Sequence, residues 1–184
     1  MASPMQLVEC VATALGVDVS TVTTHDRNLV AAGLRTKGGR GLSAARMTAN
    51  DAANLLIAVA GADQVRESVR AVESFASLVA TGRRPDAPLP GLKAGHTFGE
   101  ALTAFVQAFA DGALRGAESL WVQVEMTRPE YKAEITGTLG DTGFEVSYRP
   151  HATRDGVSAK DGDLITVTRF TRVTLQQVGE ALRR

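Results

Sequence analysis

The chain lacks several features that define common classes of protein. It has a single cysteine, Cys10, among 184 residues, so no disulfide can form within it, and this predicts a reducing compartment. It has no net charge, with 20 Lys and Arg against 20 Asp and Glu, which excludes a generally polycationic protein. The longest apolar run, from Leu55 to Ala62, is far too short for a membrane span, and no basic and apolar leader opens the sequence. We therefore expect a cytoplasmic protein.

Signatures of catalysis and of metal binding are also missing from the sequence. The three histidines, His25, His96 and His151, lie far apart, and no His-x-x-x-His, Cys-x-x-Cys or Glu-x-x-His spacing occurs. The Gly-Gly-Arg-Gly run lacks the Gly-Lys-Ser/Thr ending of a phosphate loop, and the acids of Arg154 to Asp163 lack the spacing of a calcium loop. We predict no metal, no cofactor and no enzymatic activity.

The first 34 residues have the pattern of two short helices joined by a tight turn. Gly16 can take the left-handed conformation that ends a helix, and Asp18 or Ser20 can cap the next one, which is predicted to run to about Ala32 before Gly33. The apolar residues that recur at helical spacing are Leu7, Val8, Val11 and Leu15 in the first helix and Val22, Leu29 and Val30 in the second. Two helices joined in this way predict a helix-turn-helix.

The stretch VATALGVDVSTVTTHDRNLVAAGL resembles the helix-turn-helix of bacterial winged-helix regulators. The resemblance implies that Ala12 lets the two helices cross closely, that Gly16 makes the turn, and that Val22 and Leu29 pack the recognition helix. Asp26 departs from the family pattern, which usually has an apolar residue there, so either the helix is rotated or that side of the core is open. We interpret His25 as a partly buried residue that packs the second helix, with a phosphate contact as the alternative.

The resemblance also implies a two-stranded wing after the second helix, with Lys37 to Gly41 at its tip. All the cations of the first 50 residues fall between Arg27 and Arg46, in this part of the chain. Threonine, asparagine and arginine can bond base edges, and cations can hold phosphates, so the pattern predicts contact with double-stranded DNA. The predicted DNA-binding residues are Ser20, Thr21, Thr23, Thr24, Arg27, Asn28, Arg35, Lys37, Arg40 and Arg46. A symmetric homodimer would double these contacts.

Helical periodicity continues to about residue 82 and then stops. Thr48 with Asp51 predicts a capped, buried helix that ends at Gly61, and a further helix is predicted from Asp63 to about Gly82, with Val79 on its apolar stripe. The next segment holds three prolines and has no periodicity, which is typical of a linker. We therefore divide the chain into a winged helix-turn-helix domain with trailing helices (1–82), a linker (83–96) and an α+β domain (97–184).

The second domain is predicted to pack one helix on a small antiparallel sheet. Thr97 with Glu100 caps a helix rich in phenylalanine, after which the apolar period changes from 3.6 to 2. Three strands in a meander are predicted over 120–126, 131–139 and 144–148, a fourth over 164–173, and a last short helix capped by Thr174. Trp121 lies on the polar side of its strand, where it either packs under a helix or lines a ligand or partner surface. This domain is predicted to serve dimerisation or to bind a ligand or partner.

The favoured function is therefore a sequence-specific, non-catalytic DNA-binding protein, a homodimeric transcription regulator of bacterial or prophage origin. The stretch from Lys37 to Ala62 also resembles proteins of bacterial prophages. One alternative is a DNA-recognition subunit similar to phage small terminases, which combine an N-terminal helix-turn-helix, a helical oligomerisation region and a β-rich C-terminal part. The other is a protein-interaction adaptor whose helix-turn-helix does not bind DNA.

Overall fold

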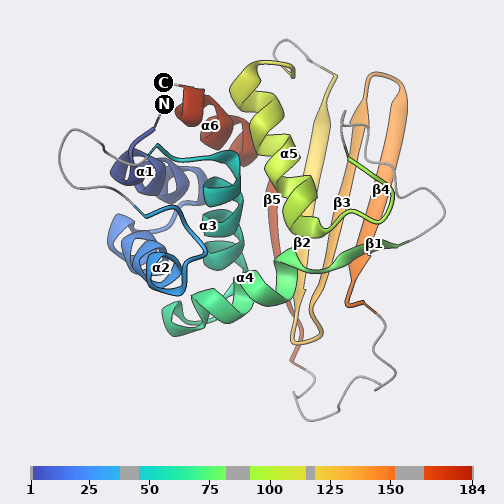
Figure 1. The fold of residues 1–184 in the computed structure, drawn as a ribbon. Helices are drawn as coiled ribbons and strands as arrows, with labels where there is room; N and C mark the ends of the chain where they lie inside the picture. Colours follow the sequence, from blue (N-terminus) through green and yellow to red (C-terminus); the bar gives the residue numbers. More distant parts are fainter. Residues whose placement is uncertain (1, 38–45, 82–91, 115–118, 152–163, 184) are drawn as a thin grey trace.

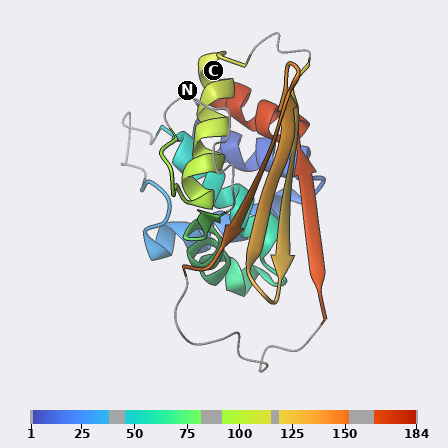
Figure 2. The ribbon, with the colours of Figure 1, turned by 90° about the vertical axis from the view of Figure 1, so that its right-hand side faces the viewer.

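The computed structural model describes residues 2–37, 46–81, 92–114, 119–151 and 164–183. In these ranges the chain forms an α+β fold of two layers, in which helices cover one face of a five-stranded antiparallel sheet. The other face of the sheet carries no described element, as Figure 2 shows from the edge. The two ends of the chain lie close together (Figure 1). The predicted α+β class is confirmed.

The two N-terminal helices form where the sequence pattern predicts them. Helix α1 spans Pro4–Leu15 and begins with a capping box of Ser3 and Gln6, while α2 spans Val19–Ala32. Gly16 and Gly33 end them with φ angles of 66° and 77°, in the left-handed region that favours glycine. The predicted inward residues Leu7, Val8, Val11, Val22 and Leu29 are buried, whereas Leu15 and Val30 are half-buried.

Helix α3 spans Ala49–Gly61 and begins with the predicted capping box of Thr48 and Asp51. The single helix predicted after it is wrong. The chain forms a 3₁₀ turn, η1, over Val65–Glu67, then α4 over Ser68–Ala76, and finally a strand, β1, over Val79–Thr81. The sheet overrides the helical period because Val79–Thr81 pairs with the strand β4, Thr142–Arg149, and Thr81 donates a side-chain hydrogen bond to the Ser147 carbonyl.

Helix α5, Phe98–Asp111, has the predicted capping box of Thr97 and Glu100. The meander is also confirmed, as β2 (Trp121–Arg128), β3 (Lys132–Leu139) and β4, and the strand β5 (Thr166–Thr171) adds to the edge of β2. The strand order is β1-β4-β3-β2-β5. Every second residue of the meander faces the helices, which buries Val122, Val124 and Met126 on β2.

Helix α6 spans Arg172–Arg183, so Thr174 is not its cap as predicted. The side chain of Thr174 is buried and its hydroxyl donates to the Ala14 carbonyl, 3.4 Å away, which ties α6 to α1. One hydrophobic core includes buried residues of α1, α2 and α3 together with those of α5, α6 and the sheet. The helices of the two predicted domains therefore share a core.

The predicted linker is partly within this fold. Residues 82–91 lie outside the described ranges, but His96 is buried and its backbone carbonyl accepts a hydrogen bond from the Ala80 amide at 2.9 Å.

Among the described helices, none has both the length and the apolar character needed to cross a membrane.

Candidate functional site

Helix α2 packs on the protein by one face and leaves the other open to solvent. Its buried residues are Val22, His25, Asp26 and Leu29, whose spacing of three and four places them on one side of the helix. Ser20, Thr24 and Arg27 are exposed on the opposite side. The predicted recognition helix therefore presents a polar face to solvent.

The hydroxyl groups on this face already bond within the helix. Thr23 and Thr24 donate to the carbonyls of Val19 and Ser20, at 2.7 and 2.9 Å. Such bonds use the hydroxyl hydrogen and leave the oxygen lone pairs free to accept. Thr24 is exposed, whereas Thr21 and Thr23 are half-buried. In this arrangement the threonines present hydrogen-bond acceptors to a ligand.

Asn28, predicted to bind a base edge, is committed to the fold. Its amide nitrogen donates to the Val65 carbonyl at 2.8 Å and to the Ser68 hydroxyl at 3.3 Å, so it joins α2 to η1 and α4. The amide nitrogen of Asn28 is therefore not available to donate to DNA, because both of its hydrogen bonds are made within the protein.

The interpretation of His25 as a packing residue is confirmed. His25 is buried, with Nδ1 lying 2.9 Å from the Ser68 hydroxyl. Since that hydroxyl donates to the Val65 carbonyl, His25 Nδ1 must carry the hydrogen of this pair. Burial lowers the pKa of the His25 imidazole from its usual value of 6.5.

Arg35, predicted to hold a phosphate, is instead buried at 8% exposure. Its guanidinium donates to both carboxylate oxygens of Asp26, at 2.7 and 2.5 Å, and to the Thr36 carbonyl. This pair corrects two predictions. Arg35 cannot reach a ligand in this arrangement, and the charge of Asp26 is balanced inside the protein, so neither a rotated helix nor an open core is needed.

Polar contacts fix the chain on both sides of residues 38–45. The Thr36 amide donates to Asp51 at 2.7 Å, and the Asn54 side chain donates to the Leu34 carbonyl at 2.7 Å, which binds the segment after α2 to α3. On the other side, the Met47 amide donates to the Ala2 carbonyl at 3.1 Å. Lys37 and Arg46 are therefore exposed at two anchored ends of this segment.

The expected wing and the predicted contact of Arg40 fall on residues 38–45, outside the described ranges. The described residues on either side, 34–37 and 46–48, form no strand. Of the ten predicted residues, the structure exposes Ser20, Thr24, Arg27, Lys37 and Arg46.

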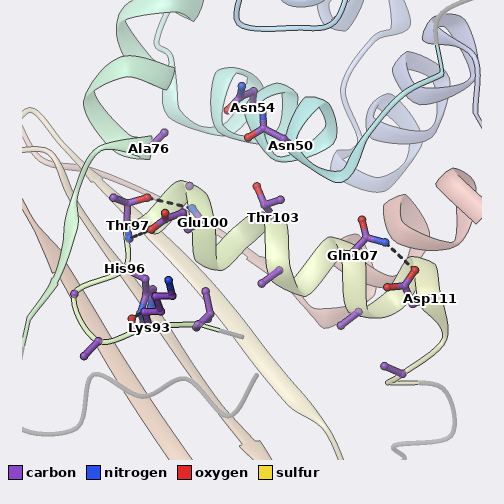
Figure 3. Close-up of a pocket in the computed structure, with 17 residues that line it drawn as sticks. Asn50, Asn54, Ala76, Lys93, His96, Thr97, Glu100, Thr103, Gln107 and Asp111 are labelled. Carbon is purple, nitrogen blue, oxygen red and sulfur yellow. Dashed lines mark hydrogen bonds between the residues drawn. The ribbon is translucent and has the colours of Figure 1, made fainter. Parts of the chain in front are cut away.

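Sequence reasoning missed a second feature, an open cavity of about 940 Å³ between α3, α5 and residues 92–97 (Figure 3). Along α5 its lining includes Glu100, Thr103, Gln107 and Asp111, which recur at helical spacing on the side opposite the buried phenylalanines. The helical spacing of these polar residues was the feature of the sequence that could have indicated the cavity. A volume of this size lies within the range of small-molecule sites.

A hydrogen-bonded chain supports one wall of the cavity. His96 Nδ1 lies 2.9 Å from the Lys93 carbonyl, which can only accept, so this nitrogen carries a hydrogen. His96 Nε2, 2.9 Å from the Tyr148 hydroxyl, then accepts from that phenol in the neutral imidazole. Burial raises the pKa of Tyr148, so the hydroxyl keeps its proton and remains a donor.

The structure also places Cys10 and Trp121. Cys10 is half-buried and its thiol lies 3.4 Å from the Gln177 carbonyl. Trp121 is 50% exposed on the open face of the sheet, so the interpretation that it packs under a helix is wrong for the described helices. Within the described ranges, no three His, Cys, Asp or Glu side chains gather closely enough to hold a metal ion.

Compared with models of known protein families, with curated proteins and with solved structures, the chain has no match.

Proposed function

We propose that the chain binds double-stranded DNA through the exposed face of α2 and the anchored residues Lys37 and Arg46. The proposed activity is that of a non-catalytic, sequence-specific transcription regulator acting in the cytoplasm. One observation carries the proposal: α2 buries one face and leaves Ser20, Thr24 and Arg27 exposed on the other. The segment that follows α2 is bound to this helix by the hydrogen bond from Arg35 to Asp26.

The proposal assigns two roles to the exposed residues. Arg27 and Thr24 lie on the helix that would enter the major groove, where arginine can bond guanine and threonine can bond a base or phosphate. Lys37 and Arg46 would neutralise phosphates on either side, as would Arg40 in the segment between them. In this proposal α1 and α2 form a winged helix-turn-helix, with residues 38–45 as its wing.

The buried pair of Asp26 and Arg35 supports this proposal indirectly. By binding the segment after α2 to α2 itself, the pair keeps Lys37 close to the recognition helix. Contacts to Asp51 and Asn54 then hold the same segment on α3. An anchored cation loses less freedom on binding than one on a free loop, so its phosphate contact is more favourable.

Fluorescence anisotropy with a random-sequence duplex, measured at several salt concentrations, tests this proposal. We expect the affinity to fall steeply with salt and Lys37→Ala to reduce the salt slope by about one unit, as for one lost phosphate contact. Arg27→Ala, which removes a base contact, should instead weaken the preference for one sequence over another. Arg169→Ala is the matched control, because Arg169 is exposed on β5 and pairs with Glu125. Selection of a preferred sequence from a random pool then tests specificity.

Two other results would each favour one of the alternative functions. Absence of DNA binding even at low salt would contradict the proposal and favour the protein-interaction adaptor. Binding by a ring of more than four subunits would favour a function similar to that of phage small terminases, whereas a dimer favours the regulator. Mass measurement in solution separates a dimer from a ring.

A further inference from the structure

We propose that the free edge of β5 is the dimerisation surface of this protein, where β5 pairs antiparallel with β5 of a second copy about a two-fold axis. The two sheets then join into one continuous sheet. This interface would supply the dimer of the proposed regulator, but it does not rest on DNA binding and is tested without DNA. Three features support it: the state of the two sheet edges, the side chains along β5 and the neutral charge of the chain.

The two edges of the sheet differ in how their backbone groups are satisfied. The strand order β1-β4-β3-β2-β5 makes β1 and β5 the edges. The β1 edge is only three residues long and is covered by residues 96–98, because the Ala80 amide donates to the His96 carbonyl at 2.9 Å. The Phe98 amide likewise donates to the Leu78 carbonyl at 2.8 Å. Natural sheets protect their edges with short, covered strands of this kind.

The β5 edge has no such cover among the described residues. This strand spans six residues, Thr166–Thr171, and pairs with β2 on one side. Figure 2 shows it at the outer edge of the sheet, with no described element beyond it. Along a strand the backbone hydrogen-bonding groups point alternately to the two sides, so about half of those in β5 point away from β2. Such groups can bind another strand.

The sequence of β5 lacks the features that prevent one sheet edge from pairing with another. From Ile165 to Thr171 there is no proline, glycine or lysine, and every residue except Arg169 is β-branched or aromatic, which favours an extended strand. The guanidinium of Arg169 donates to Glu125 on β2 at 2.7 Å, so this charge is directed back across the sheet. The outer side of β5 therefore presents no charge that would repel a second strand.

Exposed apolar side chains gather at this edge. The structure describes seven large apolar side chains as exposed, and five of them lie on β5 or beside its ends: Trp121, Leu164, Ile165, Val167 and Val173. Single exposed apolar residues are ordinary on a protein surface, whereas a group of them marks an interaction site.

These side chains form two groups at opposite ends of β5, an arrangement that suits a second copy of the chain. Leu164, Ile165 and Val167 lie at its start. Trp121 and Val173 lie just beyond the last residue pair that joins β2 to β5 at its far end. Antiparallel pairing of two identical strands brings the start of each against the far end of the other. Each apolar group then meets the other group of the partner, and both are removed from water.

The charge of the chain and the state of the β1 edge favour a closed dimer. Lys and Arg number 20, as do Asp and Glu, so two identical chains do not repel each other through their net charge. Two-fold pairing uses each β5 edge once and leaves the two β1 edges outside, where residues 96–98 cover them. The joined sheet therefore does not grow further, and we expect a dimer instead of a fibre or a ring.

Sedimentation velocity of the full chain over a range of concentrations tests the proposal. We expect a reversible dimer of twice the 19.4 kDa chain mass. Val167→Lys should raise the dimer dissociation constant about a hundredfold, because a two-fold interface contains the added charge twice. Val167 is exposed, so the folded monomer should tolerate this change, which circular dichroism checks. Met5→Lys alters an exposed apolar residue of α1 and is the matched control, with an unchanged dissociation constant.

Hydrogen exchange separates strand pairing from dimerisation through another surface. In wild type, amide exchange of residues 164–171 should slow as the protein concentration rises, because the outward amides gain partners in the dimer. In Val167→Lys it should stay fast over the same range. Trp121 gives a second readout as the only tryptophan of the chain. Its fluorescence should move to shorter wavelength on dimerisation, because its surroundings become less polar.

Four results would each overturn the proposal: a monomer at every concentration, an assembly larger than a dimer, a dimer that Val167→Lys does not weaken, or a dimer whose β5 amides exchange as fast as those of the monomer. Failure of this interface is distinguishable from failure of the proposed function. A monomer that binds DNA would remove the interface alone, whereas a dimer paired through β5 that binds no DNA would remove the DNA-binding function alone.

Discussion

The guanidinium of Arg35 and the carboxylate of Asp26 form a buried ion pair with two hydrogen bonds, Nε to Oδ1 at 2.7 Å and Nη2 to Oδ2 at 2.5 Å. Their side chains are only 6% and 10% exposed. The pair joins the middle of α2 to the segment that follows this helix. It therefore anchors the chain to α2 two residues before Lys37.

Arg35→Ala should reduce the free energy of unfolding by about 3–5 kcal/mol, because it leaves the Asp26 carboxylate buried without a counter-charge. Urea unfolding followed by circular dichroism measures the change. The double variant Asp26→Leu/Arg35→Met should recover much of the loss, since it removes both charges and keeps apolar volume. Arg27→Ala, one position from Asp26 but exposed, should change stability by less than about 0.5 kcal/mol. A mild effect of Arg35→Ala would show that the pair is not needed for folding.

Acidification should destabilise the protein through His25. Burial lowers the pKa of this imidazole in the folded state below its usual value of 6.5, so the unfolded chain takes up a proton first as the pH falls. The contribution of His25 is therefore fully present above pH 6.5 and is lost progressively below it.

Urea unfolding of wild type and His25→Gln between about pH 5 and pH 8 checks this prediction, because histidine titrates in that range. The difference in unfolding free energy between the two proteins should shrink as the pH is lowered. A difference that stays constant across the range would contradict the assigned shift.

Tyr148→Phe should cost about 1–3 kcal/mol of stability at neutral pH, because it leaves the Nε2 acceptor of buried His96 without a donor. The ring itself can keep its packing against Phe98, whose centroid lies 5.4 Å away. Thermal or urea unfolding measures the loss. Tyr148→Leu separates the two contributions, since it removes the ring as well and should cost more.

Gly179→Ala should destabilise the protein by about 1–3 kcal/mol, as expected for overpacking. Gly179 lies in α6 against α5, and an added Cβ would lie 2.5 Å from the Phe109 Cβ and 2.7 Å from the Val106 carbonyl oxygen. An exposed helix would instead gain about 1 kcal/mol from the same change. Gly143→Ala, where the nearest atom lies 3.9 Å away, is the control. A stabilised Gly179→Ala would show that the two helices can separate at little cost.

The local elements of the fold were predictable because their signals lie within a few residues of each other. The capping boxes at Thr48 and Thr97 mark helix starts by satisfying backbone amides three residues away. Alternation along 120–126 predicted a strand with one buried face, and Gly16 and Gly33 marked the helix ends by their left-handed conformation. These contacts need no distant partner, so their sequence alone specifies them.

The tertiary structure decided which polar residues remain available to a ligand. Arg35 and Asn28 have the side chains that DNA-binding proteins use. In the folded chain, however, Arg35 donates hydrogen bonds to the Asp26 carboxylate and Asn28 donates to the Val65 carbonyl. Similarly, the spacing of Val79 in the sequence fits the apolar stripe of a helix, but its backbone pairs with β4 and forms a strand.

Sequence by itself determined the helix and strand pattern, the absence of an internal disulfide and the neutral total charge. Only the tertiary structure decided that one core joins both halves, that Arg35 is buried and that Glu100 and Asp111 face a common cavity. The physical reason is that periodicity reports which face of an element is apolar. It does not report which distant group will meet a given polar side chain.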